Sequence, residues 1–395
     1  GTYLPYEKET TIELGKISNL FDAGEDMAET RVLSRDTLSM EIQKYEEEIG
    51  KDFRTEEISD ETLETALNTN TSQSDMDKMI QLGMANFVRN FGLIKESTKM
   101  NVEHITAFAI SYLGIKDLAE WEQLLDNIVV QEALEYVQKS YAAKPEPWME
   151  AIAVETFADV VMQPKSSTPY LIAFEALHIL PHLSLPHFQA MAIILLVQYS
   201  RNSNNYSLDN FRHYVSKYIE PFMEELPRED SFFQQLDYLK CLAMNREKLS
   251  FSKLMSNSYP FMFMYRGFTE EEAQGVIGNE EVTKSILVDS VNSPMKKLAI
   301  VDETMAPPLF RKMGINDKWV QQHLLSLAKS KPTGFVEPES YEILGRISPV
   351  LLTLAQQYDR TVFATSGLTL LGLYLARSHV KATIGENFDL SRWLR

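Results

Sequence analysis

The chain has 395 residues and a mass of 45.3 kDa, a length that excludes a small disulfide scaffold and predicts two or three hydrophobic cores or one long helical assembly. Hydrophobic residues make up 44% and charged residues 24%, values that exclude collagen-like, coiled-coil-only and fully disordered chains. The net charge is −18, and the richest apolar stretch, residues 188–197, is far shorter than the roughly 18 residues that a membrane span needs.

The negative charge is concentrated in the first part of the chain. Residues 1–150 contain 14 Lys and Arg against 30 Asp and Glu, a net of −16, and the remaining residues contain 24 against 26, a net of −2. An acidic surface repels phosphate backbones and attracts basic ones. Solvation of helix surfaces is the simplest explanation of this charge, and a basic protein partner and mimicry of nucleic acid are the alternatives; nonspecific binding of nucleic acid by this part is not expected.

Cysteine usage indicates a reducing compartment. The chain has one cysteine, Cys241, which cannot form an intramolecular disulfide, and 17 methionines. Residues 1–5 show neither the basic nor the apolar region of a signal peptide. We therefore expect a cytoplasmic protein without a membrane span.

Residues 1–75 are predicted to form an acidic N-terminal helical segment. Apolar residues spaced by three or four predict one amphipathic helix, and Ser59 can cap a second, shorter one. The apolar positions of the first helix are Leu38, Ile42, Tyr45, Ile49 and Phe53. Residues 68–75, NTNTSQSD, are polar throughout and predict a solvated connection. The boundary of the next unit is placed there.

Residues 76–250 are predicted to form a helical core domain. Apolar residues recur at helical spacing over 118–141 and 148–162, and prolines interrupt the pattern between segments. Ser184 can cap a helix that runs to Tyr199 and is apolar on most sides, which predicts a central position. No fixed repeat period is found, so an irregular helical bundle or a loose helical solenoid is expected.

Residues 251–395 are predicted to form an α+β C-terminal domain. The aromatic run 259–265 and the β-branched runs 286–291 and 298–301 predict a small antiparallel sheet. Thr269 and Glu272 form the pattern of a capping box. Two helices, near 340–358 and 368–384, complete the chain. The predicted fold class is therefore mainly α, with a small antiparallel β element in the C-terminal third.

Histidines at residues 178, 182 and 187 form the best metal candidate, within HILPHLSLPH. Glu175 precedes His178 by three residues, the spacing seen in carboxylate-bridged di-metal helices, yet no second Glu-x-x-His is present. A metal-dependent hydrolase built around Glu175, His178 and His182 is one alternative function. Histidines at a corner between two helices are the simpler interpretation.

Other catalytic patterns do not occur in the sequence. Cys241 lies within LDYLKCLAM and is expected inside an apolar helix as a core residue. The chain has no GxSxG elbow, no GxxxxGK[ST] loop and no GxGxxG after a strand. We assign no catalytic residue, no cofactor-binding residue, no metal ligand and no cofactor, and we expect a protein that is not an enzyme.

The end of the chain has a modest basic character that suggests a second alternative. The run 361–366, TVFATS, reads as a β segment before a helix, as in a winged-helix-like arrangement. Nucleic-acid binding through the C-terminal helices is therefore weighed against simple docking of the last helix on the core. The basic residues are Arg346, Arg360, Arg377, Lys381, Arg392 and Arg395.

The last 28 residues contain an LTxxG helix start, a lysine, a GE pair and a DLSxW ending. These are Leu368, Thr369, Gly372, Lys381, Gly385, Glu386, Asp389, Leu390, Ser391 and Trp393. With more diffuse likeness at 177–202, 214–222 and 259–268, the chain from about residue 165 to 395 resembles a family of uncharacterised bacterial proteins with no assigned activity.

The resemblance implies a cytoplasmic bacterial protein. Families of this sort often lie near phage-defence genes and mobile elements, which implies a sensor, adaptor or regulatory role. The leading expectation is a non-catalytic protein-interaction or regulatory module that binds a protein partner or assembles as a homo-oligomer.

Overall fold

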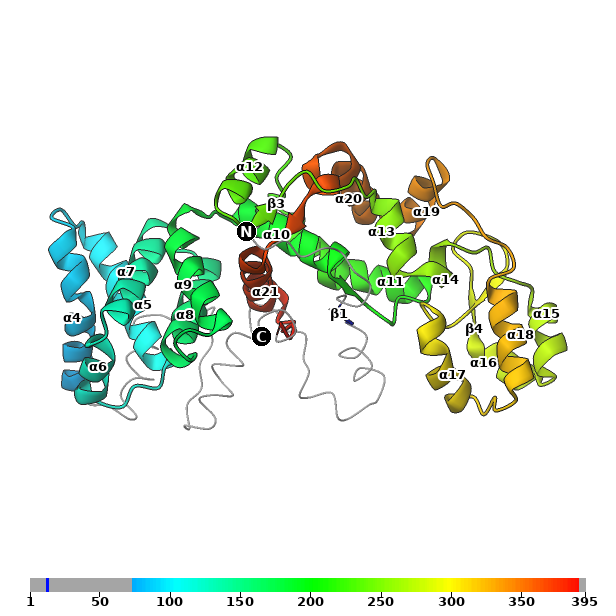
Figure 1. The fold of residues 1–395 in the computed structure, drawn as a ribbon, viewed down its shortest axis with the longest axis horizontal. Coiled ribbons are helices and arrows are strands. Elements are labelled where there is room, and N and C mark those ends of the chain that lie inside the picture. The colour runs from blue at the N-terminus through cyan, green and yellow to red at the C-terminus, as the bar shows by residue number, and fades with distance from the viewer. Residues whose placement is uncertain (1–11, 14–72, 391–395) are drawn as a thin grey trace.

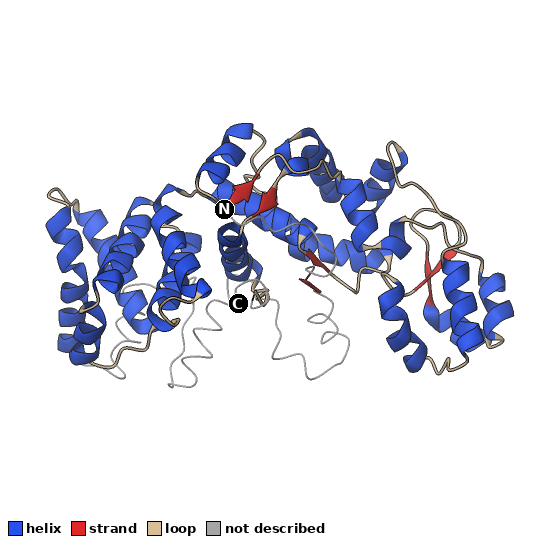
Figure 2. Cartoon of the chain, viewed as in Figure 1, coloured by secondary structure: helices blue, strands red, loops and turns tan. Residues whose placement is uncertain are grey.

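Helices dominate the structure, a computed structural model that describes residues 12–13 and 73–390 (Figures 1 and 2). The predicted mainly α class is confirmed. Most of the predicted acidic segment 1–75, including its two helices, lies outside the described residues. The described helices form an arch, with the first helices at one end, a smaller lobe at the other, and the last helix in the middle (Figure 1).

The first end of the arch is built from six helices that pack on one another as an irregular bundle. Short polar caps separate them: the Asp117 side chain accepts a hydrogen bond from Glu120 N at 2.8 Å, and the Asn127 side chain accepts one from Val129 N at 2.9 Å. The helices are α4 (Gln73–Asn90), α5 (Glu96–Tyr112), α6 (Leu118–Leu125), α7 (Ile128–Ala143), α8 (Pro147–Met162) and α9 (Thr168–Ile179).

The middle of the arch contains α10 (Leu185–Gln198), and all of its residues from 187 to 198 are buried. The predicted central position of this helix is confirmed, and so is its cap at Ser184, whose hydroxyl lies 2.8 Å from His187 Nδ1. The last helix, α21 (Leu370–Ile384), returns along the arch and packs on α10, α8 and α9. A helix from the far end of the sequence thus joins α8 and α9 to the central helix α10.

Helices around the middle extend the same core. The helix predicted near 340–358 is two helices, because Pro349 cannot donate to a continuing helix and occupies the first turn of the second. The run 361–366 was expected as a β segment, which is wrong: residues Val362–Thr365 form a 3-10 helix. The surrounding helices are α11 (Leu208–Tyr214), α12 (Asp230–Tyr238), α13 (Phe251–Ser258), α19 (Glu339–Ile347) and α20 (Pro349–Arg360).

Two short strand pairs accompany these helices. Strand β3 (Leu242–Ala243) pairs antiparallel with β6 (Gly367–Leu368), immediately before α21. Strand β1 (Ile12–Glu13) pairs parallel with β2 (Ser200–Arg201), which follows α10. An early segment of the chain therefore lies beside the centre of the arch.

The smaller lobe carries its own hydrophobic core, formed by residues between 261 and 328. A small antiparallel β-hairpin is present as predicted, although its second strand is residues 296–298 and not 298–301. The aromatic run 259–265 is largely helical, because Pro260 begins a short helix after Tyr259. Three helices here, at residues 280–286, 306–312 and 318–328, were not predicted. The lobe consists of α14 (Pro260–Phe263), α15 (Glu270–Ile277), α16 (Glu280–Ile286), β4 (Leu287–Asp289), β5 (Lys296–Leu298), α17 (Ala306–Lys312) and α18 (Lys318–Ala328).

The main core extends on both sides of this lobe in the sequence. Phe251, Leu254 and Tyr259 belong to the main core, as do residues of α19, α20 and α21. Residue 251 is therefore not a boundary between the two cores. Within residues 12–13 and 73–390, no helix combines the length and apolar character needed to cross a bilayer.

The first turn of α21 approaches β3 very closely. Thr369 caps the helix by accepting a hydrogen bond from Gly372 N, and its hydroxyl lies 3.1 Å from the carbonyl oxygen of Cys241. A Cβ atom at Gly372 would lie only 2.0 Å from that oxygen. Cys241 is buried as predicted, although it follows α12 instead of lying within a helix. Glycine is thus required for α21 to reach its position.

We predict that Gly372→Ala destabilises the protein by about 2–3 kcal/mol, because backbone atoms must move to admit the methyl group. Chemical denaturation would measure the free energy of unfolding. Gly275→Ala in α15 is the matched control, since no atom lies within 4 Å of the place that its methyl group would occupy. Equal stabilities of the two variants would contradict the prediction.

Candidate functional site

The residues chosen from the sequence as a metal site do not form one. Glu175 and His182 are exposed, whereas the His178 ring packs edge-on against Phe174 and Tyr136. His178 Nε2 lies 3.4 Å from Glu132 Oε1. Among the residues that the structure describes, no three His, Cys, Asp or Glu side chains are arranged to hold a metal ion.

His187 has a structural role at the start of α10. Its Nδ1 accepts a hydrogen bond from Ser184 N at 3.0 Å, and its Nε2 lies 2.7 Å from Gln235 Oε1. This pattern requires the proton on Nε2, and burial lowers the pKa of the imidazole. The histidine therefore completes the cap in its neutral form.

A buried charged cluster joins α8 to α21. Arg377 Nη2 and Lys381 Nζ lie 3.8 and 3.7 Å from Glu155 Oε1, and the Tyr374 hydroxyl donates a hydrogen bond to Asp159. Burial raises the pKa of Asp159. Two of the basic residues considered for nucleic-acid binding are thus turned toward a carboxylate inside the protein.

Sequence reasoning missed the acidic members of this cluster. A signal was present, because Glu155 and Asp159 stand in AVETFADVVM, a helix that is otherwise apolar on nearly all sides. Lys381 was noted for the tail pattern, but its partner lies on a helix far away in the sequence. Only the three-dimensional return of α21 brings the opposite charges together.

The end of α21 places a second acidic group in the interior. Gly385 adopts φ 72° and ends the helix, and Glu386 follows it with only 2% of its surface exposed. The Tyr218 hydroxyl donates to Glu386 Oε2 at 3.2 Å, and burial raises the pKa of this carboxyl to about 7. Since the pKa is raised, the contribution of Glu386 to stability decreases as the pH rises from 4.5 through 7.

His379 lies on α21 with 1% of its surface exposed. Its Nε2 lies 2.8 Å from Gln189 Oε1, and the rings of Phe188 and Phe222 flank it. Its Nδ1 has no hydrogen-bond partner within the described part of the chain. Burial lowers the pKa of the imidazole to about 3, so the histidine stays neutral in the folded protein at ordinary pH.

An acidic groove crosses the outer surface of α4, α6 and α7. Two hollows of about 430 and 320 Å³ share Asn86 and Gln131 and so form one continuous depression. Two apolar side chains are exposed in it, Leu82 at 37% and Ile128 at 78%. The charged residues among the lining are Glu122, Asp126, Glu132, Glu135 and Lys139. The groove therefore combines four carboxylates and one cation with apolar contacts.

The carboxylates of the groove interact with neighbouring side chains. Asn90 donates a hydrogen bond to Glu135 Oε2 at 2.8 Å, and Lys139 lies 5.5 Å from the centre of the Tyr136 ring. Burial raises the pKa of Tyr136, and the charges of Glu132 and Glu135 raise it further. In sequence these acids read as an ordinary solvated helix face, so the groove could not be predicted.

We predict that His379→Leu flattens the acid limb of the stability curve. In the unfolded chain His379 binds a proton as the pH falls below 6.5, whereas in the folded protein it stays neutral down to about pH 3. The free energy of unfolding of the wild type therefore decreases by on the order of 3 kcal/mol by pH 4. The variant is less stable than the wild type at neutral pH, because Gln189 Oε1 loses its hydrogen-bond partner. Its stability decreases less as the pH falls. Chemical denaturation at several pH values measures the free energy of unfolding, and His323→Leu, at an exposed position of α18, is the control. Parallel curves of stability against pH for the wild type and both variants would contradict the prediction.

A family model matches residues 71–394, a longer range than the residues 165–395 that carry the resemblance. No curated protein and no solved structure matches the chain. The matched range contains α21 with its charged cluster and also the helices of the acidic groove. The chain therefore belongs to this uncharacterised family along nearly all of its described residues.

Proposed function

We propose that the chain is a non-catalytic protein-interaction or regulatory module of the bacterial cytoplasm, working in a phage-defence or mobile-element system. The observation that carries the proposal is the acidic groove across α4, α6 and α7. A segment of a partner protein can insert side chains into its two hollows and pack on its exposed apolar side chains.

The charge of the groove defines the chemistry of the partner. Four carboxylates against one lysine favour a basic segment, and Leu82 and Ile128 favour apolar side chains on the same segment. An amphipathic helix with lysines or arginines beside leucine-like residues meets both conditions. The same field repels the phosphates of nucleic acid.

The groove consists of helix surfaces that are fixed from below. Trp121 is fully buried beneath it and donates from Nε1 to the carbonyl oxygen of Met79 at 3.0 Å, which joins α6 to α4. Gln138 joins α7 to α4 by donating to Gly83 O at 2.8 Å. A rigid groove loses little conformational entropy on binding, which favours affinity.

We predict that the double variant Glu132→Lys with Glu135→Lys weakens binding of a basic partner at least tenfold, because it replaces attraction by repulsion at the groove. The probe is a 14-residue amphipathic Lys/Leu helical peptide, and its affinity is measured by fluorescence anisotropy at two salt concentrations. The matched control is Glu271→Lys with Glu281→Lys, which makes the same charge change at exposed positions of the other lobe.

The proposal requires the wild-type and control proteins to bind the peptide alike, with affinity that decreases at higher salt. A wild-type protein that neither binds the peptide nor forms a complex or an oligomer in light scattering contradicts the interaction module. Equal affinity of the groove variant and the control for the peptide would contradict the acidic groove as the binding site, but not the proposal of an interaction module.

A further inference from the structure

A further hollow, separate from the two of the acidic groove, lies where the smaller lobe meets the main core. Its volume is about 550 Å³, and its walls come from the β4–β5 loop, the start of α11 and the last turn of α19. The lining residues are Leu208, Ser290, Val291, Asn292, Ser293, Pro294 and Arg346. Arg346 is the charged residue of this lining, so the hollow is locally positive in a chain of net charge −18.

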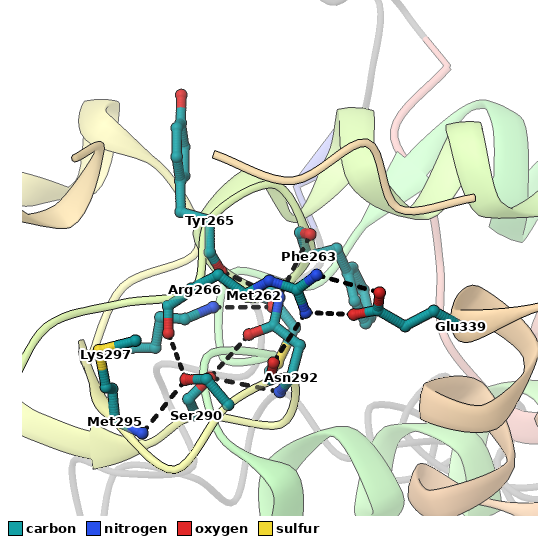
Figure 3. A network of polar contacts seen from close by, with 10 residues as sticks. Met262, Phe263, Tyr265, Arg266, Ser290, Asn292, Met295, Lys297 and Glu339 are labelled. Carbon is teal, nitrogen blue, oxygen red and sulfur yellow. Dashed lines mark hydrogen bonds and ion pairs between the residues drawn. The ribbon is translucent and has the colours of Figure 1, made fainter. Parts of the chain in front are cut away.

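The β4–β5 loop is fixed by its own side chains (Figure 3). Asn292, with 7% of its surface exposed, donates from Nδ2 to Tyr265 O at 2.9 Å. The Ser290 hydroxyl lies 2.7 Å from Asn292 Oδ1, and the Ser293 hydroxyl donates to Arg266 O. A loop with so many side-chain bonds to backbone holds one conformation without a ligand, the condition for a preformed site.

Arg266 ties this loop to α19 (Figure 3). Its guanidinium donates to Asn292 O at 2.9 Å and forms a two-pronged ion pair with Glu339, in which Nη2 lies 3.0 Å from Oε2. The bonds from Arg266 hold the pKa of Glu339 below its usual range, so the pair stays charged. One network therefore sets the distance between the loop and the helix that carries Arg346.

Lys297 fastens the hairpin from the other side. Its side chain is buried and donates from Nζ to the carbonyl oxygens of Phe261 and Met262 at 2.7 and 3.0 Å (Figure 3). Burial lowers its pKa to about 7. The Lys297 ammonium thus hydrogen-bonds to backbone carbonyls inside the lobe. The positive charge at the hollow comes from Arg346.

Several donors at this junction have no hydrogen-bond partner among the described residues. Arg346 is exposed, and its guanidinium makes no hydrogen bond or ion pair with the described residues, while Arg212 holds its backbone by donating to Arg346 O at 2.8 Å. The backbone amides of Val291 and Ser293 also donate no hydrogen bond within those residues. A guanidinium fork and backbone amides are the donors that bind a phosphate group, and none of the residues that line the hollow is acidic, although the charge of Arg346 also acts on the nearby Glu339.

We propose that this hollow binds a small organic phosphate, with the phosphate held by Arg346 and the loop amides. The volume exceeds that of inorganic phosphate and leaves space for an organic part against Leu208 and Pro294. The walls come from the β4–β5 loop of the smaller lobe and from α11 and α19, although Val291 of the loop itself packs in the main core, so the bound molecule bridges the hairpin loop and these two helices. The site is separate from the acidic groove and does not depend on it.

The test uses inorganic phosphate, ribose 5-phosphate and AMP as probes, with ribose and adenosine as uncharged counterparts, in calorimetric titrations of the full chain. We expect saturable one-to-one binding of at least one organic phosphate and tighter binding than for inorganic phosphate. Arg346→Gln is expected to raise its Kd at least tenfold, and Arg346→Lys to raise it less, because charge remains but the fork is lost.

The matched control is Arg311→Gln, which removes an exposed arginine of the smaller lobe and should bind like the wild type. Arg346 is exposed, so its variants are expected to unfold at the wild-type temperature without ligand. The proposal is overturned if no organic phosphate saturates the wild-type protein, or if Arg346→Gln binds as tightly as the control.

Discussion

The position of α21 is the constraint on which the rest of the structure depends. The last described helix reaches the centre of the arch only because Gly372 lets the carbonyl of Cys241 approach, and it then packs on α8, α9 and α10. This contact converts two stretches of helices into one continuous core. It also carries Arg377 and Lys381 to Glu155, so the charged cluster exists only as a consequence of the packing.

Features that depend on local sequence were predictable. The cap at Ser184, the capping box of Thr269 with Glu272, and the β4–β5 hairpin follow from side chains within a few residues of each other. The run 259–265 was misread because aromatic residues favour strands, whereas Pro260 fits the first turn of a helix and tertiary packing decided the outcome. Docking of the last helix on the core was considered from the sequence, but local patterns gave no sign that α19 and α20 also belong to the first core.

The functional surfaces were less predictable, because they combine residues that are remote in sequence. The Tyr374–Asp159 hydrogen bond spans 215 positions, and the organic-phosphate hollow takes its walls from α11, the β4–β5 loop and α19. The histidine cluster stood out only because its members are adjacent in the chain. In the structure these histidines have different surroundings: His187 completes the cap of α10, and His178 lies beside Glu132 at the edge of the acidic groove.

The two lobes are joined in a way that suits regulation. The apolar main core reaches the smaller lobe through Phe263 and Val301, and polar bonds reinforce the same junction, including Arg266 with Glu339 and the buried pair of Arg201 with Asp302. Directional polar bonds allow few intermediate positions, so such a junction favours discrete arrangements. A phosphate bound there contacts both sides and stabilises one arrangement by the difference in its affinity for each. The acidic groove, at the opposite end of the arch, remains free for a partner in either arrangement (Figure 1).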